Sequence, residues 1–470
     1  MFKTIYLYIL IIASFISFNA NALTLDDAKS LYIKGKYAEA LPTFKKQLAR
    51  TPKDAALNQW TGVCLYETGH TNEAIQYLEY ADSKSITEAS RYLATISFYQ
   101  YKFEDAQYYI NRYIEALSSA NSPIPNEISL LSSQITNAAN MLSRVEKIQV
   151  IDSLTVDKNN FFKYYKLSRE SGTITSTSTL PKNFSSHKPS IVFRPESQNQ
   201  MVWAMNDKNG KATLMLSSIL SDGTWEAPHA LGTNLNDNGN ANYPYIMPDG
   251  ITVYYANDGD NSIGGYDIFF SRKNENGYLQ PQNLGMPYNS IHNDYMYVID
   301  EITGIGWWAT DRNNIEGKVT IYLFIPNNVR LNYSADTPNL INLAKLTSIK
   351  DTWGEHTNFN HILNNLEKLS TDDIKSNDVR FSLTLPNGDV YTTLSDFDNT
   401  EAAIAMQEYL DALANIKSKK EYLEKLRISY QRKNDNVKQE IIETEKSILT
   451  EQDNLIRLKN IVISIESKKH

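Results

Sequence analysis

The sequence predicts a multidomain α + β chain with three parts: an N-terminal domain of helical repeats, a central domain of repeated antiparallel sheets, and a long C-terminal helix. Three observations support this prediction. A pattern of small and large residues recurs about every 34 residues early in the chain, aromatic strands recur about every 53 residues in the middle, and neither glycine nor proline occurs after Val390.

Length and composition describe a folded protein of several domains. The chain has 470 residues, of which 41% are hydrophobic, and a mean hydropathy of −0.43. A chain of this size can bury a sizeable core and is expected to divide into two to four domains. Its formal charge of −8 and its pI near 5.5 provide no basic surface for phosphates, so we expect no nucleic-acid partner.

The first residues have the pattern of a secretory signal peptide. Lys3 precedes an apolar run from Ile5 to Phe18, and Ala20 and Ala22 stand where a signal peptidase reads small residues. The run is too short to remain as a membrane span. No cysteine follows it, so lipid attachment is not expected. The sequence therefore predicts a signal peptide at 1–22, export through it, and no transmembrane anchor.

Residues 23–147 show a helical repeat. The small residue Ala40 and the large residue Phe44 recur 34 residues later as Ala74 and Leu78, and a third copy, shortened by two residues, follows at 103–110. The stretches "LYIKGKYAEALPTFKKQLARTP" and "TGVCLYETGHTNEAIQYLEYA" resemble the tetratricopeptide repeat, in which two antiparallel helices pack through such residues. We expect a solenoid, with one further amphipathic helix from 125 to about 147 as its cap.

Three aromatic residues are the candidate partner-binding residues of this solenoid. Tyr32, Tyr66 and Phe98 recur on the first helix of each copy, at a position that in this family can face the concave groove. Aromatic side chains there would provide a large contact area at low entropy cost. The alternative is that they pack between repeats. The single cysteine, Cys64, lies in an apolar helical pattern and is expected to be a buried free thiol.

Residues 148–395 alternate apolar and polar positions and contain Asn-Gly and Asp-Gly turn signals, which predicts antiparallel sheet. The aromatic strands place Ala204, Ala256 and Ala309 at spacings of 52 and 53 residues. Pro228, Gly232 and Asn236 likewise recur 53 residues later, as Pro281, Gly285 and Asn289. Units of this length with several short strands are typical of propeller blades.

The segment "YPYIMPDGITVYYANDGDNSIGGYDIFFSRKNENGYLQPQNLG" resembles the WD40-like PD40 repeat of TolB-type propellers. The resemblance covers about 190–330 and implies a β-propeller of four to six blades, with a partly helical insertion near 336–378. A hairpin about Asn387-Gly388 is expected to close the ring against the strand at 145–156.

The loop at 257–277 is interpreted as a blade turn. Asp258, Asp260 and Ser262 have the alternate spacing of a calcium loop, but Ile263 and Phe269 stand where such a loop needs glycine and glutamate. We therefore expect no metal and no cofactor. Motifs of hydrolases, nucleotide-binding enzymes and zinc proteases are missing, so we expect no catalytic residues and no enzyme activity.

Residues 400–470 predict a coiled coil, because apolar residues keep one heptad phase from Met406 to Ile465. Five core positions are polar or charged, namely Lys420, Arg427, Asn434, Thr444 and Glu451. One long rod and a two-helix hairpin that breaks at 433–436 both fit the pattern. The uncovered apolar stripe predicts association through 401–468, as a homodimer or with the helices of a partner.

The order of these parts resembles the periplasmic TPR–PD40 proteins of Bacteroidota, some relatives of which are associated with type IX secretion and gliding. This chain has heptads where they usually have an OmpA-like domain, so peptidoglycan anchoring is not carried over. The resemblance implies a non-catalytic periplasmic scaffold or adaptor for cell-envelope proteins, with a role in secretion or envelope assembly left open. The alternative is a glycan- or peptide-binding propeller, which would need Trp203, Trp307 and Trp308 to line its central funnel.

Overall fold

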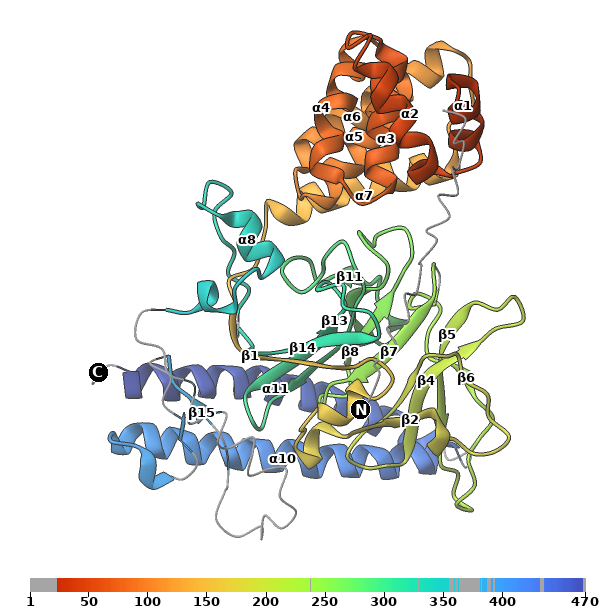
Figure 1. Cartoon of the computed structure of the whole chain (residues 1–470). Coiled ribbons are helices and arrows are strands. Elements are labelled where there is room, and N and C mark those ends of the chain that lie inside the picture. Colours follow the sequence, from red (N-terminus) through yellow and green to blue (C-terminus); the bar gives the residue numbers. More distant parts are fainter. Residues whose placement is uncertain are drawn as a thin grey trace, which may run out of the picture. The chain divides into compact units, whose positions relative to one another are not determined.

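The computed structural model describes residues 23–467, except 237, 328, 355–358, 360, 361, 363–380, 382, 387–389, 392, 393 and 432–434. The chain forms two compact units that divide between Thr136 and Asn137, and each unit is described by itself below (Figure 1). The signal peptide predicted at 1–22 lies outside the described residues.

The first unit consists of helices that pack in sequence order, each antiparallel pair forming one repeat. Its helices are α1 (Leu25–Ile33), α2 (Tyr37–Leu48), α3 (Ala55–Glu67), α4 (Thr71–Ser83), α5 (Thr87–Tyr99) and α6 (Phe103–Ser119). The helix predicted as a cap is α7 (Asn126–Leu142), which runs across the boundary between the units. Thr24 and Asp27 form a capping box that fixes the start of α1.

The repeat pattern read from the sequence forms the core of this unit. The small residues Ala40, Ala74 and Ala106 are fully buried, as are the large residues Phe44, Leu78 and Ile110. A side chain at Gly62 would come within 2.7 Å of Leu78 Cγ, so glycine is required where α3 approaches α4. The predicted helical repeats are thus confirmed.

The second unit contains three antiparallel sheets of similar construction. The first sheet has the order β2 (Thr173–Ser176), β3 (Ile191–Arg194), β4 (Gln200–Asn206), β5 (Ala212–Ser218) and β6 (His229–Ala230). The second has β7 (Ala241–Ile246), β8 (Thr252–Asn257) and β9 (Asp267–Asn274), with β10 (Gly277–Tyr278) and β11 (Gln282–Asn283) both paired to β9. The third has β12 (Asp294–Asp300), β13 (Ile305–Thr310), β14 (Lys318–Ile325) and, from far earlier in the chain, β1 (Gln149–Asp157).

The 53-residue period is a structural repeat. Ala204, Ala256 and Ala309 are all fully buried and occupy the second of the repeated strands in each sheet, β4, β8 and β13. The first strands of the second and third sheets both contain a bulge, where Tyr243 and Met296 have φ of 52° and 55°. The sheets lie in series, with β7 packed on the first sheet and β12 packed on the second.

No closed ring of sheets is detected among the described residues, which contain three large sheets and one two-stranded hairpin, β15 (Leu383–Thr384) with β16 (Val390–Tyr391). The prediction that this hairpin pairs with the strand at 145–156 is wrong. β1 pairs with β14 along its whole length, and β15 pairs with β16. The hairpin instead packs its Leu383 and Tyr391 against the C-terminal helices, where they bury apolar surface.

The space between the first strands of the sheets is filled by the segment that joins β1 to β2. Its short helices are η1 (Phe161–Tyr164), η2 (Arg169–Ser171) and η3 (Thr177–Thr179). The Phe161 ring contacts the rings of Tyr243 and Tyr295, from β7 and β12. Tyr165 Oη donates a hydrogen bond of 2.8 Å to Met296 O. The chain therefore supplies its own apolar filling between the sheets.

The segment after β14 carries the short helices α8 (Leu340–Lys345) and η4 (Ile349–Thr352). Thr352 Oγ1 accepts a hydrogen bond from Val150 N, and Trp353 Nε1 donates one to Val150 O, so this segment covers the outer edge of β1. Most of the rest of the partly helical insertion expected near 336–378 lies outside the described residues.

The C-terminal heptads form an antiparallel hairpin of α10 (Thr400–Gln431) and α11 (Lys438–Glu466), entered through η5 (Leu394–Asp396) and turned through η6 (Asp435–Val437) (Figure 1). Of the two alternatives, the hairpin is therefore correct. The apolar heptad residues Ile416, Leu423 and Ile448 are buried between the helices. Two of the polar core positions also pair across the hairpin, Arg427 with Glu445 at 2.8 Å and Glu451 with Asn415 at 3.0 Å.

Most of the apolar stripe that predicted association is covered within one chain. Along that stripe, Met406, Leu458 and Val462 are buried as well. Burial of each such side chain is worth roughly 1.5–3 kcal/mol, and the hairpin obtains it without a second copy. Across the described residues, no helix is both long enough and apolar enough to traverse a lipid bilayer.

Candidate protein-binding site

The first helices of the three repeats, α1, α3 and α5, carry the predicted partner-binding residues. Tyr32 and Tyr66 are half-buried, whereas Phe98 is only 4% exposed. The Tyr32 hydroxyl accepts a hydrogen bond of 2.9 Å from Gln59 Nε2, and the Tyr66 ring lies 5.4 Å from the Tyr92 ring of the next repeat. Tyr32 and Tyr66 therefore pack between repeats on one side and keep part of their surface exposed.

Two exposed large hydrophobic residues lie next to the predicted residues in the sequence and were missed by the sequence reasoning. Ile33 is 83% exposed and Tyr99 is 53% exposed, and each directly follows one of the predicted residues, Tyr32 or Phe98. One residue is 100° around a helix, so the exposed member of each pair depends on how the helix is rotated. The 34- and 32-residue spacings locate both positions equally well and do not distinguish them.

Charged groups lie beside these aromatic residues. The Arg91 guanidinium lies 4.3 Å from the centre of the Tyr92 ring, and its Nε donates a hydrogen bond of 2.8 Å to Glu88. The Tyr92 hydroxyl donates one of 3.0 Å to Glu67. The surface thus combines apolar contact area with charged groups of both signs.

Burial makes the phenols of Tyr32 and Tyr66 harder to deprotonate. It raises the pKa of Tyr32 to about 12 and also raises the pKa of Tyr66, in both cases because the charged form loses solvation. Burial also raises the pKa of the nearby Cys64 thiol to about 12. As expected, Cys64 is a fully buried free thiol. It stays protonated at neutral pH and therefore does not react as a thiolate.

The central sheets do not present the tryptophans that a glycan-binding funnel would need. Trp203, Trp307 and Trp308 are all no more than 1% exposed. Trp203 stacks on Phe184 at 5.4 Å and donates to Ser185 O, while Trp308 packs among aromatic residues of β14. Trp307 lies against Tyr165, within the filling between the sheets. Their surfaces are used in packing.

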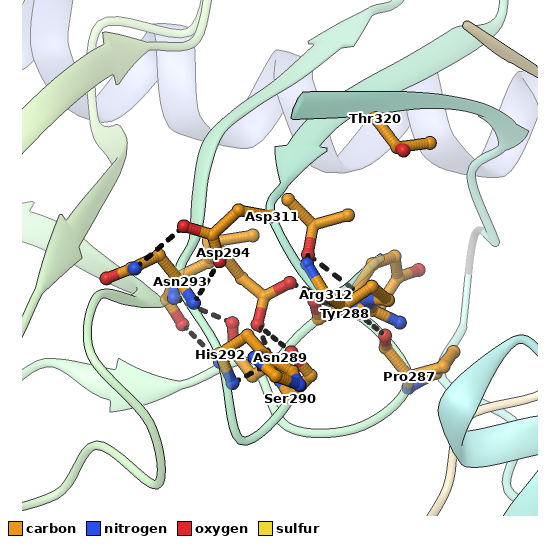
Figure 2. A network of polar contacts seen from close by, with 12 residues as sticks. Pro287, Tyr288, Asn289, Ser290, His292, Asn293, Asp294, Asp311, Arg312 and Thr320 are labelled. Atoms are coloured by element: carbon orange, nitrogen blue, oxygen red, sulfur yellow. Dashed lines mark hydrogen bonds and ion pairs between the residues drawn. The ribbon is translucent and has the colours of Figure 1, made fainter. Parts of the chain in front are cut away.

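The aspartates and asparagines of the repeated loops form a network that links neighbouring sheets (Figure 2). Asn293 N and Nδ2 donate to the two oxygens of Asp311 at 2.8 and 2.9 Å. Asn293 Oδ1 accepts from Tyr266 N, at the start of the preceding sheet's third repeated strand. Asn240, which lies 53 residues earlier, makes the same bonds to Asp258, and its Oδ1 accepts from Ala212 N of the first sheet.

A second repeated contact explains the Asn236–Asn289 alignment. Asn289 exchanges two hydrogen bonds with the backbone of Ile268, at 2.7 and 2.9 Å. Asn236 does the same with Leu214, at 2.8 and 3.1 Å. The side-chain amide thus acts as one extra residue of a strand. Its oxygen is the acceptor for a buried backbone N–H, and its nitrogen is a second donor to a carbonyl that also accepts from Leu284 N or Leu231 N.

The third part of the network is a buried ion pair. Arg312 and Asp294 are 2.8 Å apart, with side chains 4% and 0% exposed (Figure 2). The same guanidinium nitrogen donates to Pro287 O and Tyr288 O, and Ser290 donates to the other Asp294 oxygen. Because the charges are neutralised and hydrogen-bonded, the pair anchors the loop before β12 to the turn that follows β13.

Carboxylates of the loop at 257–277 accept hydrogen bonds from other groups of the chain. Asp258 is engaged by Asn240, and Asp267 accepts hydrogen bonds from Ile263 N and Asn283 Nδ2. A side chain at Gly264 would come within 2.3 Å of His292 O, so the paired glycines allow this loop to cross the next one closely. Within the described ranges, no three His, Cys, Asp or Glu residues are grouped so that they could hold a metal ion.

Comparison with known proteins identifies one part of the chain. Residues 31–84 match the tetratricopeptide repeat family, which covers α2, α3 and α4 and the last residues of α1. No curated protein matches the chain in sequence. The matched repeats contain Tyr32 and Tyr66, and tetratricopeptide repeats typically mediate protein–protein interaction and are not catalytic.

Proposed function

We propose that the protein is a non-catalytic adaptor or scaffold whose first unit binds an extended segment of a partner protein along α1, α3 and α5. The observation that carries the proposal is the match of residues 31–84 to the tetratricopeptide repeat, together with exposed Ile33 and Tyr99 beside half-buried Tyr32 and Tyr66. Phe98 supports this surface from beneath, because it packs against Phe103.

The second unit serves in this proposal as a rigid platform of PD40-type sheets, related to a β-propeller. The structural use of its repeated polar residues supports a platform in preference to an active site. Asn240, Asn293, Asn236 and Asn289 all hold backbone or neighbouring side chains in place.

The proposed location is the periplasm, with export through residues 1–22, and the proposed partners are other cell-envelope proteins. The N-terminal sequence pattern and the order of the modules support this location. A role in secretion or envelope assembly is part of the same proposal. Homodimerisation through 401–468 is not part of it, because α10 and α11 cover each other's heptad residues.

The first prediction tests the surface on α1, α3 and α5. The double substitution Ile33→Asp and Tyr99→Ala removes exposed side chains, so we expect it to preserve folding and to reduce recovery of cross-linked partners about tenfold, as loss of one strong contact does. Recovery is measured by cross-linking in intact cells, affinity purification of the full chain and mass spectrometry. Tyr66→Ala is expected to reduce recovery further and to lower thermal stability.

Tyr108→Ala is the matched control, because Tyr108 is 56% exposed but lies on α6, a second helix of its repeat. It is expected to recover the same partners as the unchanged chain. If the double variant also recovers them in full, the surface does not bind partners, and Tyr32 and Tyr66 are only packing residues.

A further inference from the structure

The turns that join the first and second strands of the three repeats meet the same structure, the α10–α11 hairpin. These turns lie between β3 and β4, between β7 and β8, and between β12 and β13. Lys417 of α10 lies 3.1 Å from Glu196 in the first turn, and Lys420 Nζ donates to Pro248 O in the second. Glu301, in the third turn, interacts electrostatically with Lys420 and with Lys459 of α11.

All three contacts involve charged side chains, and these side chains are buried to different extents. Lys417 and Glu196 have side chains 57% and 30% exposed, so water and salt screen this pair and it contributes little. Lys420 and Lys459 are more enclosed: burial lowers the pKa of both ammonium groups, and burial raises the pKa of Glu301. Asp249 and Asp300 are the other acidic groups that act on this cluster.

The hairpin is held together by contacts that do not involve the sheets. Ile416, Leu423 and Ile448 are buried between α10 and α11. At the base, Met406 and Val462 pack against the β15–β16 hairpin. The buried Glu466 carboxylate also accepts hydrogen bonds from Tyr391 Oη and from backbone N–H groups at the start of α10. The hairpin therefore has the internal contacts to stay folded when its lysines leave the turns.

The sheets likewise have their own internal support. The turn between β7 and β8 is closed by Asp249, which accepts from Ile251 N and Thr252 N, and the turn between β12 and β13 by Asp300, which accepts from Ile302 N and Thr303 N. These bonds persist without the hairpin. Separation would expose the lysines and carboxylates of this contact, which water solvates well, and also Tyr409 of α10, which interacts electrostatically with Glu301.

We propose that the α10–α11 hairpin is an electrostatic strap that detaches reversibly from the three turns as a folded unit and uncovers an acidic surface formed by Glu196, Asp249 and Glu301. The attraction is between lysines on the strap and carboxylates on the turns. Salt screens the exposed Lys417–Glu196 pair strongly and the partly buried Lys420 and Lys459 less, whereas the apolar contacts inside the hairpin are not weakened in this way.

Amide hydrogen exchange of the full chain tests this proposal. Between about 0.1 M and about 1 M NaCl the screening length falls from ~10 Å to ~3 Å. We expect exchange in the three turns to accelerate at least about tenfold over this range, while β4, β8 and β13 and the helices α10 and α11 stay protected. Unchanged exchange in the turns overturns the proposal, as does loss of protection in turns and strands together.

Charge-removing variants provide the second measurement. Lys420→Gln and Lys459→Gln are expected to give fast exchange in the turns already at about 0.1 M NaCl, with the strands still protected. Lys425→Gln on α10 and Lys446→Gln on α11 are the matched controls, because both lysines are exposed, and they should leave the turns slow. Equal exchange in the test and control variants contradicts the proposal. If either test variant loses strand protection, Glu301→Gln removes the same attraction from the sheet side and decides the matter.

Discussion

At the scale of single residues, Glu466 has the most consequential position in the hairpin. Its side chain is fully buried at the end of α11. Its two oxygens accept from Tyr391 Oη at 3.0 Å, Asp398 N at 2.8 Å and Asn399 N at 3.2 Å. Because Asn399 immediately precedes α10, the carboxylate of one helix lies at the positive N-terminal end of the other and joins the two ends of the hairpin.

The Glu466→Ala variant should lower the free energy of unfolding by about 3 kcal/mol, because three donors then lose their buried acceptor. Denaturant titration followed by far-ultraviolet circular dichroism measures the change. Glu466→Gln, which keeps one oxygen, is expected to fall between. Glu443→Ala is the control, since Glu443 is exposed and bonds only to Gln439 one turn away. Equal stability of the two alanine variants would show that Glu466 does not hold the hairpin.

His292 is expected to make the stability of the folded sheets depend on pH. Burial lowers its pKa from 6.5, so the imidazole takes up a proton less readily in the folded chain than in the unfolded chain. Below the ordinary pKa the unfolded chain takes up a proton that the folded chain does not, and stability falls as pH falls. We expect the melting temperature to drop between about pH 7.5 and about pH 5.5, and to drop less in His292→Gln. Identical pH profiles would exclude His292 as the cause.

At the scale of elements, the sequence identified the repeats but not the reason for their polar residues. The 53-residue spacing of Asn236 and Asn289 was visible, and both side chains prove to hydrogen-bond the backbone of β5 or β9. The calcium alternative for the loop at 257–277 arose from the same ambiguity, because carboxylates serve metals and backbone amides equally well. In the structure, Asp258 accepts a hydrogen bond from the backbone N–H of Asn240, which is the backbone-amide role.

The Asn289→Ala variant should destabilise the second unit by about 2 kcal/mol, since it removes the acceptor of the buried Ile268 N–H and one of the two donors to Ile268 O, which keeps its bond from Leu284 N. Asn236→Ala should behave alike, because its bonds to Leu214 are equivalent. Asn261→Ala, at an exposed position of the loop at 257–277, serves as the control and should change stability by less than about 0.5 kcal/mol. Thermal unfolding measures all three, and a neutral Asn289→Ala would refute the proposed role.

At the scale of the whole molecule, periodicity predicted what is local in sequence. The helical repeats, the strands that follow one another in each sheet, and the helical C-terminus all follow from patterns within about 50 residues of chain. Contacts between distant segments were not predictable in this way. The pairing of β1 with β14, the packing of Phe161 between sheets and the approach of Lys420 to Pro248 depend on how separate patterns meet in space.

The candidate binding surface shows the same limit. The repeat spacing located one turn of each first helix and selected Tyr32, Tyr66 and Phe98. It could not show that the Phe98 ring turns inward while Tyr99 is exposed, because this depends on the rotation of α5 against its neighbours.

The pairing of β1 with β14 also has a consequence for biosynthesis. Thr155 and Thr320 lie on these paired strands and are 165 residues apart. At about 5–20 residues per second, a ribosome needs roughly 10 to 30 s to make the intervening chain. For that time β1, with its apolar residues Val150, Ile151 and Val156, has been synthesised and has no strand to join. The nascent chain therefore exposes an apolar strand without a partner. This strand needs a chaperone, or continuous transfer away from the ribosome, until the third sheet can form.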